Sequence, residues 1–141
     1  MSVQRLREFV ENFTRLLETR PSEDRILVEG RQLVATLVAV DDWLPDQFAQ
    51  PHPQHYQQYL LYTDPLDRLS IVSFVWGPGQ KTAIGDVHEV ANALANQASI
   101  SIHVYGRNIG RVKRHIFDPA TGAAKDFVSG YASAVVPNLW I

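Results

Sequence analysis

The sequence contains no cysteine among its 141 residues. Disulfide bonds, thiolate metal ligands and cysteine nucleophiles are therefore excluded as elements of this chain. A domain of this length buries about two-thirds of the surface of its unfolded chain, so it needs no covalent cross-link to fold. Hydrophobic residues make up 45% and charged residues 20%, as in ordinary globular proteins. We expect a single domain over residues 1–141.

The sequence also lacks an excess of charge of one sign. Thirteen Lys and Arg residues face fifteen Asp and Glu residues, which gives a formal charge of −2. This balance argues against a general nucleic-acid binder. No apolar run approaches the roughly 20 residues that cross a bilayer, and residues 1–13 lack the apolar core of a signal peptide. We expect a soluble, cytoplasmic protein without nucleic-acid or membrane partners.

Residues 1–45 have the pattern of two helices. Apolar residues of the first recur at helical spacing: Val3, Leu6, Phe9, Val10, Phe13, Leu16 and Leu17. Arg20-Pro21 should end that helix, because the residue before proline disfavours helical geometry. Ser22 is a suitable N-cap for a second helix. The apolar stripe predicted for this helix is Ile26, Leu27, Leu33, Val34, Leu37 and Val38.

From residue 56 onward the pattern changes to strands. The predicted strands are residues 56–62, 69–76, 99–105, 112–117 and a short one at 127–131. A turn at 118–122 should end the fourth. Helices followed by strands predict an α+β fold with an antiparallel β part over residues 56–141. The five or six strands fall short of the roughly eight of a double-sheet jelly roll.

The segment Ser99–Tyr105 alternates between apolar and polar side chains. Ile100, Ile102 and Val104 share one face of the expected strand, and Ser101, His103 and Tyr105 share the other. The polar face could simply contact water. It could equally line a polar interior, where a Ser–His–Tyr hydrogen-bond chain would orient the tyrosine hydroxyl. The alternation alone does not decide between these two interpretations.

The other histidines give weak signals for a metal site. His88 follows Gly85-Asp86 and could be delivered to a metal by a strand, but a single imidazole identifies no metal. His52 and His55 flank Pro53, which argues against a helical ligand pair, so we place both in a loop. His115 falls on the strand face opposite Arg114, and we assign it no role.

Arg114 belongs to a basic cluster with Arg107, Arg111 and Lys113. These charges could be solvated groups at a strand edge. Arg114 could instead clamp a carboxylate, because a guanidinium offers two parallel hydrogen bonds. Gln58 could add a neutral hydrogen bond to the same anion.

Several segments together resemble the bacterial cysteine dioxygenase family. The matching segments are residues 42–45, 57–62, 72–80, 85–88, 101–106 and 130–131. Animal cysteine dioxygenases have arginine at the position of Gln58. With glutamine there, this chain is more similar to the 3-mercaptopropionate dioxygenase branch. Members are cupins, small jelly-roll β-barrels that bind one non-haem Fe(II) through three histidines. They add both atoms of O2 to a thiol sulfur and form a sulfinic acid.

The resemblance also implies roles for individual residues. His88 matches an iron ligand. Ser101, His103 and Tyr105 match the Ser–His–Tyr chain whose hydroxyl faces substrate and oxygen. Arg114 and Gln58 match the residues that hold the substrate carboxylate.

The chain departs from the family pattern after Gln80. The family has a His-x-His motif there, which supplies two iron ligands, whereas this chain continues directly to Gly85-Asp86-Val87-His88. The resemblance therefore implies an internal deletion at 84/85 that removes this motif and the central strands of the barrel. We expect a thiol dioxygenase that oxidises cysteine or 3-mercaptopropionate. The alternative is an inactive relative that binds small anions or self-associates.

Overall fold

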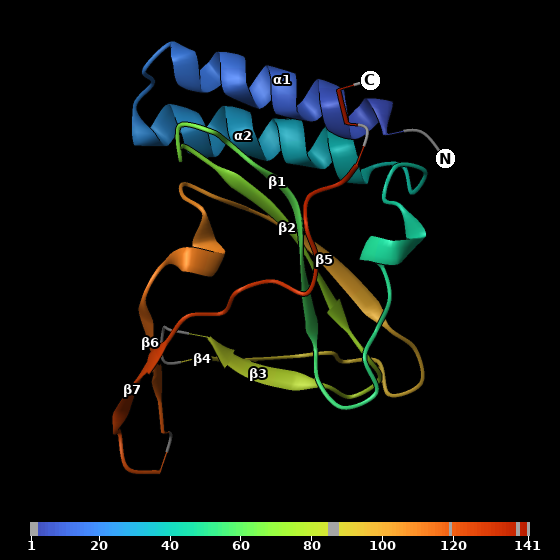
Figure 1. Ribbon diagram of the computed structural model, residues 1–141, viewed down its shortest axis with the longest axis vertical. Coiled ribbons are helices and arrows are strands. Elements are labelled where there is room, and N and C mark those ends of the chain that lie inside the picture. The colour runs from blue at the N-terminus through green and yellow to red at the C-terminus, as the bar shows by residue number, and fades with distance from the viewer. Residues whose placement is uncertain (1–2, 85–87, 119, 138, 141) are drawn as a thin grey trace. The chain divides into compact units, whose positions relative to one another are not determined.

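The computed structural model describes residues 3–84, 88–118, 120–137 and 139–140, and excludes the side chains of residues 82–84, 88–89 and 116. Its described elements are two helices, two short 3-10 turns and seven strands (Figure 1). The chain divides into two compact units: residues 1–46 with 136–141, and residues 47–135.

The first unit contains two helices, α1 (Gln4–Glu18) and α2 (Glu23–Val38). The Ser22 Oγ accepts a hydrogen bond from the Arg25 backbone N–H at 3.2 Å. This bond satisfies one of the N–H groups that have no partner within a helix. The predicted cap and the predicted break before α2 are thus confirmed.

The two helices differ in how well they bury their apolar residues. On α1, the buried residues are Leu6, Phe9, Val10, Phe13 and Leu16. Gly30 of α2 lies close to Phe13, since a Cβ atom there would come within 3.1 Å of the ring. The stripe predicted for α2 is partly wrong. Leu37 is buried, but Leu27 and Val38 are 63% and 51% exposed.

The second unit contains a three-stranded antiparallel sheet in the order β1-β2-β5 (Figure 1). Its strands are β1 (Gln57–Thr63), β2 (Ser70–Trp76) and β5 (Ser99–Tyr105). All seven residues of the central strand β2 are buried. The sequence predicts these strands to within one residue at each end, because a continuous apolar run is typical of a fully buried strand.

Two hairpins complete the second unit. The strands β3 (Lys81–Ile84) and β4 (His88–Ala91) form one, and β6 (Arg114–Phe117) and β7 (Ala124–Phe127) form the other. The 3-10 turn η2 (Ile109–Arg111) precedes β6, and η1 (Asp46–Phe48) precedes β1. η2 shortens β6 relative to the strand predicted from residue 112.

The prediction of a last strand at 127–131 is wrong. The Asp118 Oδ1 accepts hydrogen bonds from the N–H groups of Ala120 and Thr121, and Gly122 adopts a positive φ of 72°. This tight turn lets the chain pair with β6 from Ala124 onward. The strand therefore ends at Phe127, and residues 128–131 form a loop.

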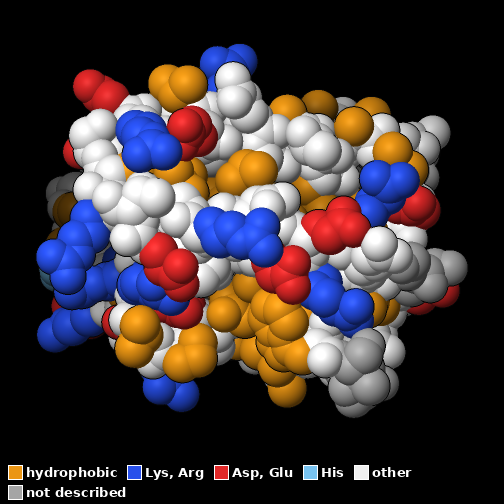
Figure 2. All heavy atoms as spheres, turned by 90° about the horizontal axis from the view of Figure 1, so that it is seen from above, with side chains coloured by type: hydrophobic (Ala, Val, Ile, Leu, Met, Phe, Trp, Pro, Cys, Tyr) orange, Lys and Arg blue, Asp and Glu red, His pale blue; other side chains and the backbone are white. Residues whose placement is uncertain are grey.

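The architecture is α+β, with two helices followed by antiparallel sheets. The strands of the described ranges form three separate sheets and no closed barrel. In those ranges no helix has both the length and the apolar character that a membrane crossing requires. Basic, acidic and hydrophobic side chains are interspersed over the face shown in Figure 2.

Leu61 provides a test of packing in the second unit. Its side chain is completely buried in β1, whereas Leu66 is 71% exposed. Leu61→Ala should lower the free energy of unfolding by about 2–5 kcal/mol, because it removes buried methyl groups and leaves a cavity. Leu66→Ala should change it by less than about 0.5 kcal/mol. Urea unfolding of both variants measures the difference, and equal effects would contradict this packing.

Candidate functional site

The register of the three-stranded sheet places the polar residues of β1 and β5 on one face. Gln58 and Ser101 both lie opposite Phe74 of β2, and His103 lies opposite Val72. Directly opposed residues of an antiparallel pair share a face. Gln58, Ser101, His103 and, two residues further, Tyr105 therefore occupy the same side of the sheet.

Ser101 and His103 form a hydrogen-bonded pair on this face. The Ser101 Oγ lies 2.8 Å from the His103 Nε2, and the Trp76 indole N–H donates to the same Oγ at 3.4 Å. The indole can only donate, whereas the serine hydroxyl can donate one hydrogen bond and accept two, so it can pair with either tautomer of His103. Burial lowers the pKa of His103 and favours its neutral state.

Tyr105 contacts His103 through its ring. The two ring centroids lie 5.9 Å apart with an interplanar angle of 13°. Burial raises the pKa of Tyr105, and the positive charge of Arg114 partly offsets this effect. Tyr105 also packs against the buried cluster of Leu60, Val72, Phe74 and Trp76. The phenol is therefore held neutral, within electrostatic range of Arg114.

Arg114 and Gln58 converge on Ser129. The Gln58 Nε2 donates to the Ser129 Oγ at 3.3 Å, and the Arg114 Nη2 donates to the same oxygen at 3.1 Å. The Arg114 guanidinium also lies over the Phe127 ring, 5.2 Å from its centroid. Its Nε is buried and has no hydrogen-bond partner among the residues that the structure describes. A buried N–H of a cation without an acceptor is costly, so this atom is suited to an anionic ligand.

A pocket of about 310 Å³ adjoins this convergence point. It is lined by His55, Tyr56, Gln57, Gln58, Ser129, Gly130, Tyr131 and Ala132. Gly130 has a positive φ of 59°, and the Ala132 N–H donates to the Gln58 backbone oxygen at 2.8 Å. These features hold the loop after β7 beside β1. The pocket is large enough for a small organic acid.

Tyr131 connects this loop to η2. Its hydroxyl donates to the Asn108 Oδ1 and accepts the Gly110 N–H at 2.7 Å. Only glycine fits at position 110, because a Cβ atom there would lie 2.4 Å from the Tyr131 ring. No pattern in the sequence assigns a role to Ser129 or Tyr131. The only available signal for the loop is the Gly130-Tyr131 part of the family resemblance.

The structure does not bring the other candidates into this site. The rings of His52 and His55 stack on each other at 3.8 Å, in a loop as expected. His115 pairs with Asp126 on the exposed side of the β6–β7 hairpin, opposite Arg114. His88 lies in β4 with its backbone opposite Ile84, but its side chain is outside the described part. The expected deletion point at 84/85 also falls outside, because residue 85 is not described.

The described side chains do not form a three-histidine iron site, and the side chain of His88, the predicted iron ligand, lies outside them. Apart from the side chains of residues 82–84, 88–89 and 116, residues 3–84, 88–118, 120–137 and 139–140 contain no group of three or more His, Asp or Glu side chains that could hold a metal. His103 is engaged by Ser101, and His115 by Asp126. No chemical step at iron therefore follows from the described side chains.

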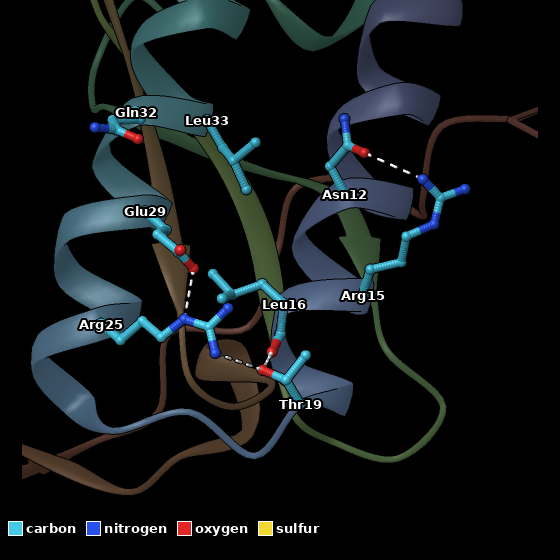
Figure 3. A pocket seen from close by; sticks show the side chains of 8 residues that line it. All are labelled: Asn12, Arg15, Leu16, Thr19, Arg25, Glu29, Gln32 and Leu33. Carbon is cyan, nitrogen blue, oxygen red and sulfur yellow. Dashed lines mark hydrogen bonds and ion pairs between the residues drawn. The ribbon is translucent and has the colours of Figure 1, made fainter.

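A second pocket, of about 420 Å³, lies between α1 and α2 in the first unit (Figure 3). Leu16 and Leu33 point into it. At one end Arg25 bonds to Glu29 at 3.0 Å and to Thr19 at 3.3 Å. Arg15 bonds to Asn12 across the pocket's other side. Most of its polar side chains are thus hydrogen-bonded to one another, and it contains none of the predicted site residues.

Comparison with models of known protein families finds no match to this chain.

The half-buried His103 should make stability depend on pH. Its pKa in the folded protein lies below the ordinary 6.5, so the unfolded chain binds a proton more readily. The contribution is complete above the unfolded-state pKa of about 6.5 and is lost as the pH falls through the lower pKa of the folded state. His103→Gln should reduce this loss of stability. Urea midpoints at a series of pH values below 7 measure it, and identical pH profiles for the two proteins would contradict the assignment.

Proposed function

We propose that this chain is a thiol dioxygenase that binds cysteine or 3-mercaptopropionate and oxidises the sulfur to the sulfinic acid. The overall reaction is R–SH + O2 → R–SO2H, so both oxygen atoms end on the sulfur. The proposal includes the cupin relationship that the sequence motifs imply. It is carried by one observation: Gln58 and Arg114, far apart in sequence, converge on Ser129, while the Arg114 Nε has no partner in the described part of the chain.

The convergence supports carboxylate binding. A carboxylate near Ser129 could accept hydrogen bonds from the Arg114 guanidinium and from the Gln58 amide, and it would give the buried Nε an acceptor. Hydrogen bonds to charged groups contribute about 1.5–3 kcal/mol each. Two donors from different strands also fix the orientation of a ligand, which a single point charge does not.

The residues of β5 support a role beside the reacting end of the ligand. Tyr105 presents a neutral hydroxyl, which can donate a hydrogen bond to an oxygen atom. No protein partner of this hydroxyl is present in the described part of the chain. His103 and Ser101 hold the neighbouring ring in place. We therefore assign Tyr105 to hydrogen bonding of the oxidised sulfur group, and Ser101 and His103 to positioning.

A second function is favoured by the metal donors. Because the described side chains do not fit the three-histidine Fe(II) site of the family, the chain could bind the thiol carboxylate without oxidising it. This alternative keeps the roles of Arg114 and Gln58 and removes that of Tyr105. The two functions differ in oxygen consumption and agree in ligand binding.

Substitution of Arg114 tests carboxylate binding. Arg114→Gln should weaken binding of 3-mercaptopropionate about tenfold or more, because it removes a charged hydrogen-bond donor. Calorimetric titration measures this, with 1-propanethiol as the ligand that lacks a carboxylate. Arg111→Gln, which removes a nearby guanidinium outside this site, is the matched control. Equal effects of the two substitutions would exclude Arg114 as the clamp.

Oxygen uptake tests the dioxygenase proposal itself. Protein of confirmed intact mass is loaded anaerobically with Fe(II), its iron content is measured, and thiol is added with O2. We expect thiol-dependent oxygen uptake with formation of the sulfinic acid, and slower turnover in Tyr105→Phe at unchanged iron content. Ligand binding without oxygen uptake would overturn the dioxygenase proposal in favour of the binding function. Unchanged turnover in Tyr105→Phe would remove this residue from the mechanism.

A further inference from the structure

A third pocket, of about 750 Å³, lies in the second unit beside the turn η2. Its lining includes three cationic side chains, Arg107, Arg111 and Lys113, and two carboxylates, Asp64 and Asp67. Arg114 is absent from this lining and bonds to Ser129 instead. Three members of the basic cluster therefore line this pocket, whereas the fourth, Arg114, belongs to the carboxylate site proposed above.

The carboxylates of this pocket are engaged by other groups. Asp64 accepts two hydrogen bonds from the Arg68 side chain, at 2.7 and 3.0 Å. The Asp67 Oδ1 accepts the Asn108 N–H at 2.8 Å. Arg68 neutralises the charge of Asp64, so Asp67 is the one lining carboxylate without a cationic partner in the described part of the chain.

The cations are less completely paired. Lys113 forms an exposed ion pair with Asp126 at 2.9 Å. The guanidinium groups of Arg107 and Arg111 have no hydrogen bond or ion pair among the residues that the structure describes. Among the described residues, the lining therefore has two guanidinium groups without a partner and one carboxylate without a cationic partner, which leaves a positive balance. The Asp67 carboxylate can accept a hydrogen bond from a donor group on the same ligand.

The backbone that carries both arginines is fixed by hydrogen bonds. The buried Ser70 Oγ donates to the Arg107 carbonyl and accepts the Ile109 N–H at 3.2 Å. The Arg111 N–H bonds to the Asn108 carbonyl at 3.0 Å, which closes the turn η2. A ligand would therefore have to order only the two side chains, and this lowers the entropic cost of binding.

We propose that this pocket binds a phosphate-bearing small molecule through Arg107 and Arg111. Guanidinium groups match phosphate oxygens through paired hydrogen bonds and keep their charge at any physiological pH. The volume suits a ligand of nucleotide size. Such a ligand also carries hydroxyl groups, which can donate hydrogen bonds to the Asp67 carboxylate. This pocket shares no lining residue with the pocket beside Ser129, and the proposal does not rest on the thiol dioxygenase reaction.

The test is a calorimetric titration with ADP, pyrophosphate and adenosine, without divalent cations and at low ionic strength. ADP and pyrophosphate should bind one per chain, and adenosine should not saturate. Arg107→Gln and Arg111→Gln should each weaken ADP binding about tenfold or more. ADP binding without pyrophosphate binding would overturn the phosphate assignment, and adenosine binding as tight as that of ADP would do the same.

Two control variants separate binding in this pocket from nonspecific charge attraction and from binding at the carboxylate site. Lys125→Gln removes an exposed cation of β7 that does not line the pocket, and Arg114→Gln removes the cation of the other site. Both should leave the ADP affinity within about twofold, since neither removes a direct contact. Equal weakening by Lys125→Gln would show nonspecific charge attraction and overturn the proposal. Circular dichroism and thermal unfolding of each variant establish that it remains folded.

Discussion

The pairing of β2 along both of its edges is the constraint on which the candidate site depends. This strand is buried along its whole length and fixes the registers of β1 and β5 at the same time. Because side chains alternate between the faces of a strand, a shift of one residue in either register would move its polar residues to the opposite face. Gln58 would then lie on the far side of the sheet from His103. The hydrophobic burial of β2 thus determines which polar groups can act together.

The same packing sets the electrostatic character of the site. Phe74 and Trp76 lie beside the polar residues of β5, and the Phe74 ring is 4.7 Å from that of His103. Such surroundings disfavour charge on imidazole and phenol groups, so both groups remain hydrogen-bonding partners at neutral pH. Arg114 is different because a guanidinium stays charged in this environment. The site therefore combines one permanent cation with neutral donors and acceptors, which is appropriate for a small anionic ligand.

Local patterns in the sequence were sufficient to predict the helices, the Ser22 cap and the three strands of the main sheet. These features depend on apolar periodicity and on interactions between residues close in sequence. Ser129 could not be predicted, because its role comes from contacts with Gln58 and Arg114 across long stretches of chain. The strand at 127–131 was misplaced because its start depends on the geometry of the preceding turn.

The alternation of β5 left two interpretations open. The structure shows the polar residues of β5 half-buried and Ile100 46% exposed. The polar face is therefore not simply the solvent-exposed face of the strand.

Tyr131 has a consequence for how ligands in two pockets of the second unit would affect each other. Its ring lines the smaller pocket, and its hydroxyl is bonded to Asn108, which lines the larger one. Gly110 leaves no free space behind the ring, so the tyrosine cannot shift without moving η2. A molecule that displaces Asn108 must change the free energy of the Tyr131 position. Two ligands that both shift Tyr131 would therefore change each other's affinity by the same factor in either order of binding. Such coupling would pass through one phenol side chain and would need no domain movement.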